Sequence, residues 1–459
     1  MMDLAHPRAT TRADHVEQAQ HELLTRLADA DHQTRVAVRI PPLSMTGVLS
    51  RLGGDASLWL SSEGEACVGT CHTTVAEARG PNRFAALREG WRTAAAVNNS
   101  TSGCPAMRLF LGATFDDADY DDVWNGYGRA FLSAPAVSVE RHDGQHWWVV
   151  APVGDVGQRR YAIEEMRRAI LESPPVPSAN RTNDSLLVES GGTTREEHMA
   201  LVDDALRRIG EQGASKIVAA RRLDLRFDAA IDVPAVLQQL AFGYPNCARF
   251  AWRWNADGEW RTFLGATPER LVKINGKAVR SEALAGTAST QDVGAADALM
   301  NSVKDQAEHR AVVDHIRESL SPLCKSLKIG SAPELRALKN ALHLRTGISG
   351  TLEDGVDVFD VLQRLHPTPA VGGVPVDAAL RWIREREPTP RGGYAAPIGW
   401  VDANGDADVM VAIRSAVVRG DRAHLFAGGG IVAGSEAEGE WEETNLKLQA
   451  MLEPMRGEA

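Results

Sequence analysis

The pattern of apolar and polar positions predicts short β-strands over the first third of the chain. One helix interrupts them at residues 81–97, where Phe84, Leu87 and Trp91 recur at helical spacing. The predicted strands cover residues 36–40, 57–60, 107–115 and 146–150, with Gly and Asp in the turns between them. This part of the chain has the pattern of a sheet-forming scaffold without an obvious catalytic cluster.

Beyond this region, strands and helices are mixed. A helix begins after Thr193 or Thr194, either of which is a good N-cap, and stops near Gly213. A strand follows, with Lys216 at its start, and Asn275-Gly276 predicts a hairpin turn. A further helix is expected over about residues 300–320. Strands that are mixed with helices, and do not alternate with them, predict an α+β fold.

The last hundred residues predict three more strands and a final helix. One strand runs unbroken over residues 408–418 and puts Arg414 on one face with Met410 and Ala412. The next strand ends at Ala427, and Gly428-Gly429-Gly430 then forms a turn that leads to a helix from about Glu438.

Glu440, Glu443 and Lys447 lie at positions i, i+3 and i+7 of this final helix and therefore share one face. Two carboxylates and an amine near a helix start can hold a divalent cation together with an anionic ligand. The same spacing also suits a solvated face with an ordinary Glu443–Lys447 ion pair. The three preceding glycines favour a binding site, because they leave room for a ligand or a second backbone.

The chain divides into three segments by composition. Residues 1–32 form a polar lead-in with a helical pattern from Ala13, residues 33–180 form the β-rich half, and residues 181–459 carry the candidate chemistry. A Pro-, Ser- and Asn-rich passage at 173–187 separates the two larger segments and is typical of a surface connector.

Composition excludes several classes of protein. The 459 residues are 44% hydrophobic and 24% charged, as in soluble globular proteins. A net charge of −11 without a basic stripe argues against nucleic acid as a partner. The N-terminus has no apolar signal region, and no run reaches the roughly 18 apolar residues of a membrane span, so we expect a cytoplasmic protein. The five scattered cysteines are expected to be reduced.

Eight motifs occur in an order and spacing that resemble the chorismate-utilising enzymes, the family of anthranilate synthase component I and the isochorismate synthases. The resemblance is close over about residues 195–455 and looser before it. It implies one large α+β unit with two antiparallel sheets packed face to face and helices outside, so that residue 180 is not a true domain boundary. The motifs are SKIVAARR, FLGATPERLV, SEALAGTAST, KDQAEHR, LHLRTGISG, LHPTPAVGG, GGYAAPIGWVDANGDADVMVAIRSA and LFAGGGIVAGSEAEGEWEETNLKL.

The resemblance implies two catalytic residues. Lys216 matches the general base of isochorismate and salicylate synthases, whereas aminating members have glutamine there. Glu269 matches the general acid that protonates the departing 4-hydroxyl. By themselves, a lysine that starts a strand is more often a guard on a sheet edge, and Glu269 could be a turn carboxylate paired with Arg270.

Three acids match the family's Mg2+ site. Glu308 and Glu443 match the two ligands that hold Mg2+ against the ring carboxylate of chorismate, and Glu440 matches an acid that orients a metal-bound water. Mg2+ keeps several waters and needs only one or two carboxylates besides the oxygens of its substrate. Glu308 alone could equally face solvent on its helix.

The remaining matches concern the substrate. Arg414 resembles the clamp on the enolpyruvyl group, a role that suits the two-pronged guanidinium, although it could also lie on a wet sheet face. His343 matches a histidine near the ring or is a structural histidine. Gly428 could simply end a strand. The other matched contacts are Gly286, Thr287, Ala370, Tyr394 and Lys447.

Two positions separate this chain from relatives. Ala288-Ser289-Thr290 stands where many relatives place arginine, so no contact from that arginine is expected. Ala285 stands where aminodeoxychorismate synthases hold a nucleophilic lysine, and alanine cannot attack.

The resemblance therefore implies an Mg2+-dependent isochorismate synthase, an isomerase acting on chorismate. The β-rich first half resembles menaquinone-pathway members more than siderophore-pathway members. Alternatives are a salicylate synthase, which also eliminates pyruvate, and a non-catalytic chorismate-binding subunit; Ala370 and Val371 in LHPTPAVGG resemble the isochorismate type. We expect a monomer or homodimer that needs no membrane and no glutaminase subunit.

Overall fold

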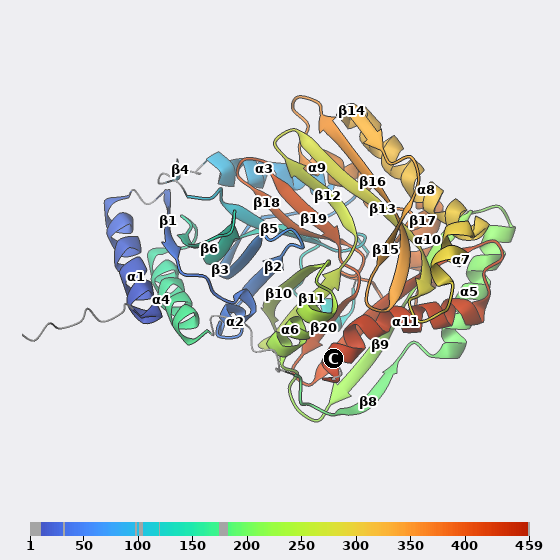
Figure 1. Ribbon diagram of the computed structural model, residues 1–459, viewed down its shortest axis with the longest axis horizontal. Coiled ribbons are helices and arrows are strands. Elements are labelled where there is room, and N and C mark those ends of the chain that lie inside the picture. Colours follow the sequence, from blue (N-terminus) through green and yellow to red (C-terminus); the bar gives the residue numbers. More distant parts are fainter. Residues whose placement is uncertain are drawn as a thin grey trace, which may run out of the picture.

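The computed structural model describes residues 11–30, 33–96, 99–100, 104–118, 120–173 and 182–457. Helices and strands are mixed along the chain, and the strand pairs are antiparallel except for one short parallel pair among the described strands (Figure 1). The predicted α+β class is thus confirmed. The start of the polar lead-in and most of the predicted connector lie outside the described residues.

Strand β6 (Ala130–His142) joins the whole sheet system. Strand β3 (Ala66–Glu77) pairs along one of its edges, while β5 (Arg108–Ala113) and β7 (Gln145–Val150) pair with successive parts of the other. Strand β7 in turn pairs with β1 (Thr34–Ile40), which meets β4 (Asn99–Ser100) in the parallel pair. Two series of strands therefore diverge from β6.

The first series continues from β3. Its next members are β2 (Ala56–Leu60), β10 (Ala248–Ala256), β11 (Glu259–Thr267), β20 (Ser415–Arg419), β21 (Arg422–Val432) and β9 (Lys216–Phe227). Strands β8 (Leu187–Gly192) and β17 (Gly373–Val374) pair with the free edge of β9.

The second series continues from β5. Its next members are β18 (Pro397–Asp402), β19 (Ala407–Val411), β12 (Arg270–Asn275), β13 (Ala278–Ser289) and β16 (Ala341–Leu352), which carries β14 (Cys324–Ile329) and β15 (Glu334–Ala337). The two series correspond to the two expected sheets. A hydrophobic core that includes Phe263 of the first and Ile398 of the second lies between them.

The helices lie outside the sheets. One end of the molecule carries α1 (Arg12–Asp29) and α4 (Val156–Glu172), and the opposite end carries α5 (Arg195–Gly210), α7 (Ala295–Asn301), α8 (Val303–Leu320) and α10 (Val376–Arg386) (Figure 1). The final helix, α11 (Ala437–Met455), packs on β21, α5 and α6 (Val233–Gly243). The short α2 (Met45–Leu49), α3 (Arg83–Ala96) and α9 (Val358–Leu365) complete the shell. No helix in the described ranges is both long and apolar enough to span a membrane.

Each of the two hydrophobic cores takes residues from both halves of the chain. The first contains Leu87 and Val358, and the second contains Val36 and Met451. Packing thus ties the β-rich half to the half that carries the candidate chemistry.

Two local predictions are wrong. The three glycines do not form a turn: β21 continues through them to Val432, with Gly428, Gly429 and Gly430 paired to Ala220, Ala219 and Val218 of β9. The strand expected over residues 408–418 is broken into β19 and β20, because Arg414 lies between them with a left-handed φ of 49°.

The break at Arg414 has a structural reason, since the chain passes there from the second strand series to the first. A second crossing, in the opposite direction, joins β11 to β12 and contains Glu269. The crossings are bonded to each other: the Val411 amide donates to the Glu269 carbonyl at 3.0 Å, and the Ala266 amide donates to the Arg414 carbonyl at 3.1 Å. Two of the predicted functional residues therefore lie side by side where the sheets meet.

Candidate active site

A single cavity gathers most of the residues singled out in the sequence. It lies between the two crossings and the helices α8 and α11. Eleven of the thirteen predicted site residues line it: Glu269, Gly286, Thr287, Glu308, His343, Ala370, Tyr394, Arg414, Gly428, Glu443 and Lys447. The other two lie against glycines of β21, Lys216 beside Gly430 and Glu440 beside Gly429.

Lys216 is the first residue of β9 and is buried, with 2% of its surface exposed. Its amine donates to the Glu308 carboxylate of α8 at 2.8 Å. A solvated edge lysine is thereby excluded. The ion pair brings together, across the fold, the predicted base and one of the predicted metal ligands.

A second lysine–glutamate pair lies on α11. The Lys447 amine contacts the Glu443 carboxylate at 2.5 Å and donates to the Gly428 carbonyl at 2.8 Å. Burial alone would raise the pKa of Glu443, but the adjacent ammonium outweighs it and lowers this pKa. Glu443 therefore keeps its negative charge at the cavity wall.

Glu440 lies one turn earlier on α11 and is almost fully buried. Burial, with the nearby Glu443 as the second cause, raises the pKa of Glu440. Lys304 of α8 lies 3.5 Å from one carboxylate oxygen, while the other, Oε2, has no hydrogen-bond partner among the described residues. A buried carboxylate oxygen without a partner is costly unless a ligand or water meets it.

The three glycines of β21 make room for these side chains. A Cβ at Gly430 would lie 2.8 Å from Glu308 Oε1 and 2.9 Å from Lys216 Cε, and one at Gly429 would lie 2.7 Å from Glu440 Oε2. The two glycines meet different side chains because successive residues of a strand face opposite sides of the sheet. Other groups therefore approach these glycines closely, as expected, but these groups are side chains of the same protein.

These residues fit a magnesium ion. Glu308 and Glu443 face one cavity, and Glu440 Oε2 lacks a partner nearby. The three acids do not form a tight cluster: within the described ranges, only exposed or half-buried Glu65, His142 and Asp143 bring three possible ligand atoms within 4.8 Å of one another. A looser set of carboxylates suits Mg2+, which retains several waters and takes further oxygens from its substrate.

Glu269 lines the same cavity. It is 5% exposed, and its carboxylate has no hydrogen-bond partner among the described residues. Burial, with the nearby Glu282 as the second cause, raises the pKa of Glu269 to about 7. A carboxyl group in this setting can hold a proton near neutral pH and give it up to a ligand.

Arg414 is oriented by His343. The guanidinium donates to His343 Nε2 at 3.3 Å, and the ring's Nδ1 lies 2.8 Å from the Gly286 carbonyl, to which it can donate. Burial, reinforced by the Arg414 charge, lowers the pKa of His343 to about 3, so the ring is neutral. Thr287 lies at 3.4 Å from the same Nδ1. A neutral imidazole thus holds the Arg414 cation at the crossing between β19 and β20.

Tyr394 is positioned by two glycines. Trp124 packs so closely over Gly392 and Gly393 that a Cβ at Gly392 would lie 2.2 Å from its ring. The chain then turns and stacks Tyr394 on Phe426, with ring centroids 5.4 Å apart. The phenol reaches the cavity beside Gly428.

Sequence reasoning missed one charged residue in the cavity wall. Arg391 is buried, and its guanidinium contacts Glu387 at 2.5 Å and donates to the carbonyls of Val218 and Val371. These bonds hold the segment with Val371 and the adjacent Ala370 against β9. The only signal in the sequence was an arginine directly before Gly392-Gly393-Tyr394.

Comparison with known proteins assigns a family. The model of the chorismate binding enzymes matches residues 16–456. The salicylate biosynthesis isochorismate synthase of Pseudomonas aeruginosa is 35% identical over 394 residues, which cover 83% of this chain and 80% of the relative. Isochorismate synthase MenF of Bacillus subtilis is 34% identical and is matched over 76% of this chain and 75% of its own.

Solved structures agree on the fold. The menaquinone-specific isochorismate synthase MenF of Escherichia coli superimposes with a TM-score of 0.79 at 24% identity and covers 96% of this chain and 99% of its own. Anthranilate synthase component I of Streptococcus pneumoniae superimposes with a TM-score of 0.62 over 76% of this chain. With a family match over nearly its whole length and relatives above 30% identity, the chain belongs to the chorismate binding enzymes.

Proposed function

We propose that the protein is an isochorismate synthase that converts chorismate to isochorismate. The observation that carries this proposal is the approach of two reactive groups to one cavity: the Lys216 amine is bonded to Glu308 of the cavity wall, and the Glu269 carboxyl, which has no hydrogen-bond partner among the described residues, lines the same cavity. The names of the relatives support the same activity.

In this mechanism the neutral amine form of Lys216, and not its ammonium form, takes a proton from a water molecule that attacks C2 of the ring. The ring double bonds shift, and the 4-hydroxyl group leaves as water with a proton from Glu269. One water enters and one leaves, so the reaction is an isomerisation. Glu269 suits this role because its pKa of about 7 keeps much of the carboxyl protonated near neutral pH.

Arg414 and Lys447 bind the carboxylates of the substrate. Arg414 presents a two-pronged donor held by His343, and Tyr394 and Gly428 shape the wall beside it. Positioning by these groups supplies much of the rate enhancement. Ala285 and Ala370 lie in the wall where a nucleophilic lysine or a bulkier residue would crowd the ring.

Glu308 and Glu443 would hold a Mg2+ ion, with Glu440 one turn before Glu443 on α11. The ion would supply positive charge to the ring carboxylate of chorismate. Removing divalent cations with EDTA is expected to abolish turnover, and excess Mg2+ is expected to restore it. Undiminished turnover in EDTA would remove the metal from the proposal.

The pathway proposed is menaquinone synthesis, with siderophore synthesis as the alternative. The first is favoured by the superposition on the menaquinone-specific enzyme, which extends over 96% of this chain and includes its β-rich half. The chain is proposed to work in the cytoplasm, as a monomer or homodimer without a glutaminase subunit.

Product analysis tests the activity. Purified protein, chorismate and Mg2+ are incubated without other proteins, and the products are separated by chromatography. Isochorismate alone supports the proposal. Salicylate with pyruvate would identify a salicylate synthase, and no turnover would favour a non-catalytic binding subunit.

A further inference from the structure

A second buried carboxylate, Glu282, lies next to the proposed acid. It belongs to β13, is 8% exposed, and lines no part of the cavity. Its two oxygens accept hydrogen bonds from the Arg270 amide at 3.2 Å and from Arg345 Nε at 2.6 Å. Arg336 lies at 4.0 Å. A buried carboxylate needs such partners, and Glu282 has them.

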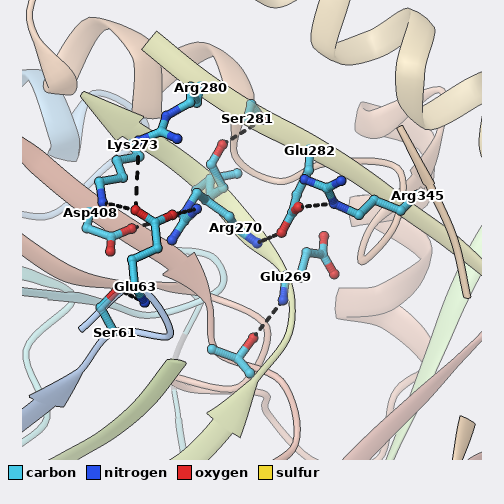
Figure 2. A network of polar contacts seen from close by, with 12 residues as sticks. Ser61, Glu63, Glu269, Arg270, Lys273, Arg280, Ser281, Glu282, Arg345 and Asp408 are labelled. Atoms are coloured by element: carbon cyan, nitrogen blue, oxygen red, sulfur yellow. Dashed lines mark hydrogen bonds and ion pairs between the residues drawn. The ribbon is translucent and has the colours of Figure 1, made fainter. Parts of the chain in front are cut away.

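Glu282 is bonded to the backbone that carries Glu269. The amide that it accepts belongs to Arg270, the residue directly after Glu269, at the point where the chain crosses between the sheets. Figure 2 shows the Glu269 side chain directed toward the side on which the Glu282–Arg345 pair lies. A change at Glu282 can therefore act on Glu269 through both position and charge.

The Arg270 side chain does not bond to Glu282. Its guanidinium extends away and contacts Glu63 at 2.6 Å and buried Asp408 at 3.2 Å, as Figure 2 shows. Arg345 of β16, which is one-third exposed, is the nearest counter-ion of Glu282. The charge of Glu282 is thus balanced by Arg345 of β16, and not by the side chain of Arg270, which follows Glu269 in the chain.

The other groups that act on Glu269 are mostly cations. They are Lys216 of β9, Arg414 between β19 and β20, and Lys447 of α11, together with the phenol of Tyr394 ahead of β18. Each cation favours the ionised carboxylate of Glu269, whereas Glu282 and burial oppose ionisation. Among the charged neighbours of Glu269, Glu282 has the largest effect on its pKa.

We propose that Glu282 is a positioning residue, which fixes the segment bearing Glu269 and keeps the Glu269 carboxyl protonated against the three surrounding cations. The proposal rests on the function given above, in which Glu269 donates a proton. Glu282 itself touches no reacting atom.

The test compares two variants that are expected to move the pH profile of kcat/KM in opposite directions. Glu282→Gln removes the negative charge, so the alkaline limb of the kcat/KM profile is expected to move to lower pH, with about a tenfold loss of rate above the limb for each pH unit moved. Arg345→Gln removes the counter-ion at a partly exposed position and is expected to move the limb to higher pH. Glu63→Gln, a control in the outer part of the network, is expected to leave it in place.

A direct measurement separates this proposal from the activity itself. The carbonyl band of the protonated Glu269 carboxyl is followed by difference infrared spectroscopy without substrate, with Glu269→Gln to assign the band. It is expected to disappear at lower pH in Glu282→Gln and at higher pH in Arg345→Gln, whatever product the enzyme forms.

Two results would overturn the proposal. One is a folded Glu282→Gln protein whose Glu269 band titrates as in the unaltered protein. The other is a loss of rate that is equal at every pH, which indicates a structural role. If Glu282→Gln does not fold, Arg345→Gln decides by itself. A Glu269 band that disappears at the same pH in Arg345→Gln as in the unaltered protein would then overturn the proposal.

Discussion

The two sides of the cavity treat buried charge in different ways. On the side of α8 and α11, carboxylates are paired with amines, Glu308 with Lys216 and Glu443 with Lys447. On the side of the crossings, Glu269 has no partner among the described residues and His343 is neutral. A paired carboxylate keeps its charge at neutral pH, whereas a buried one without a partner tends to hold a proton. One cavity thus contains both charged and protonated carboxyl groups, and their surroundings decide which is which.

The strongest test of this contrast removes the base on the paired side. Lys216→Ala is expected to abolish turnover, while chorismate affinity stays within about tenfold, or about 1.4 kcal/mol. Steady-state kinetics and equilibrium binding measure the two effects. Lys339→Ala, which breaks an exposed pair with Glu453, is the matched control and should keep full activity. Full activity in Lys216→Ala would remove this residue from the mechanism.

The next test fills the space beside the Lys216–Glu308 pair. Gly430→Ala puts a methyl group against Glu308 and Lys216, and a displacement of this kind is expected to lower kcat roughly a hundredfold. Gly191→Ala on β8, where no atom lies within 4 Å of the added carbon, is expected to have no such effect. Equal rates for the two variants would show that the close approach has no functional role.

Arg414→Lys tests the side of the crossings. The variant keeps the charge but loses the two-pronged donor and the contact with His343, so KM for chorismate is expected to rise roughly tenfold with a smaller change in kcat. Arg419→Lys, in a partly exposed pair with Asp122, serves as the control. An unchanged KM would argue against a role of Arg414 in binding.

The last expected effect concerns stability and not turnover. Folding raises the pKa of Glu269 from 4.5 to about 7, so the folded state holds a proton that the unfolded state releases, and stability falls as pH rises between these values. Above pH 7 the cost is on the order of 3 kcal/mol. Glu269→Gln should therefore have a higher free energy of unfolding than the unaltered protein at pH 8, and nearly the same one at pH 4.5. Urea unfolding at both pH values measures the difference, and a destabilised variant at pH 8 would contradict it.

Much of the secondary structure follows from local patterns. Thr194 caps α5 as predicted, and Asn275-Gly276 forms the expected hairpin turn, because caps and tight turns depend on residues close in sequence. The broken strand at Arg414 was missed, since apolar alternation continues through a point where the chain changes sheets.

The site could not be predicted from local patterns alone, because its residues lie far apart in the chain. Spacing alone could place Glu440, Glu443 and Lys447 on one helix face, but only the family resemblance linked them to Lys216 and Glu308. The three glycines suggest a turn from local sequence alone. The side chains that leave no room for a Cβ at these positions belong to β9, α8 and α11, which are distant in the chain. Arg391 and Glu282 could not be singled out from the sequence, since each has a partner far away in the chain, Val218 for Arg391 and Arg345 for Glu282.

The shared strand β6 has a practical consequence for dissecting the protein. A fragment that starts at residue 182 would keep every side chain in the proposed mechanism, yet it would lose β2 and β5, the partners of β10 and β18. Both orphaned strands would then present open, largely apolar edges, which favour self-association of the truncated polypeptide. Expression trials of the isolated second half should therefore yield insoluble material, even though the shortened polypeptide retains all of the chemistry.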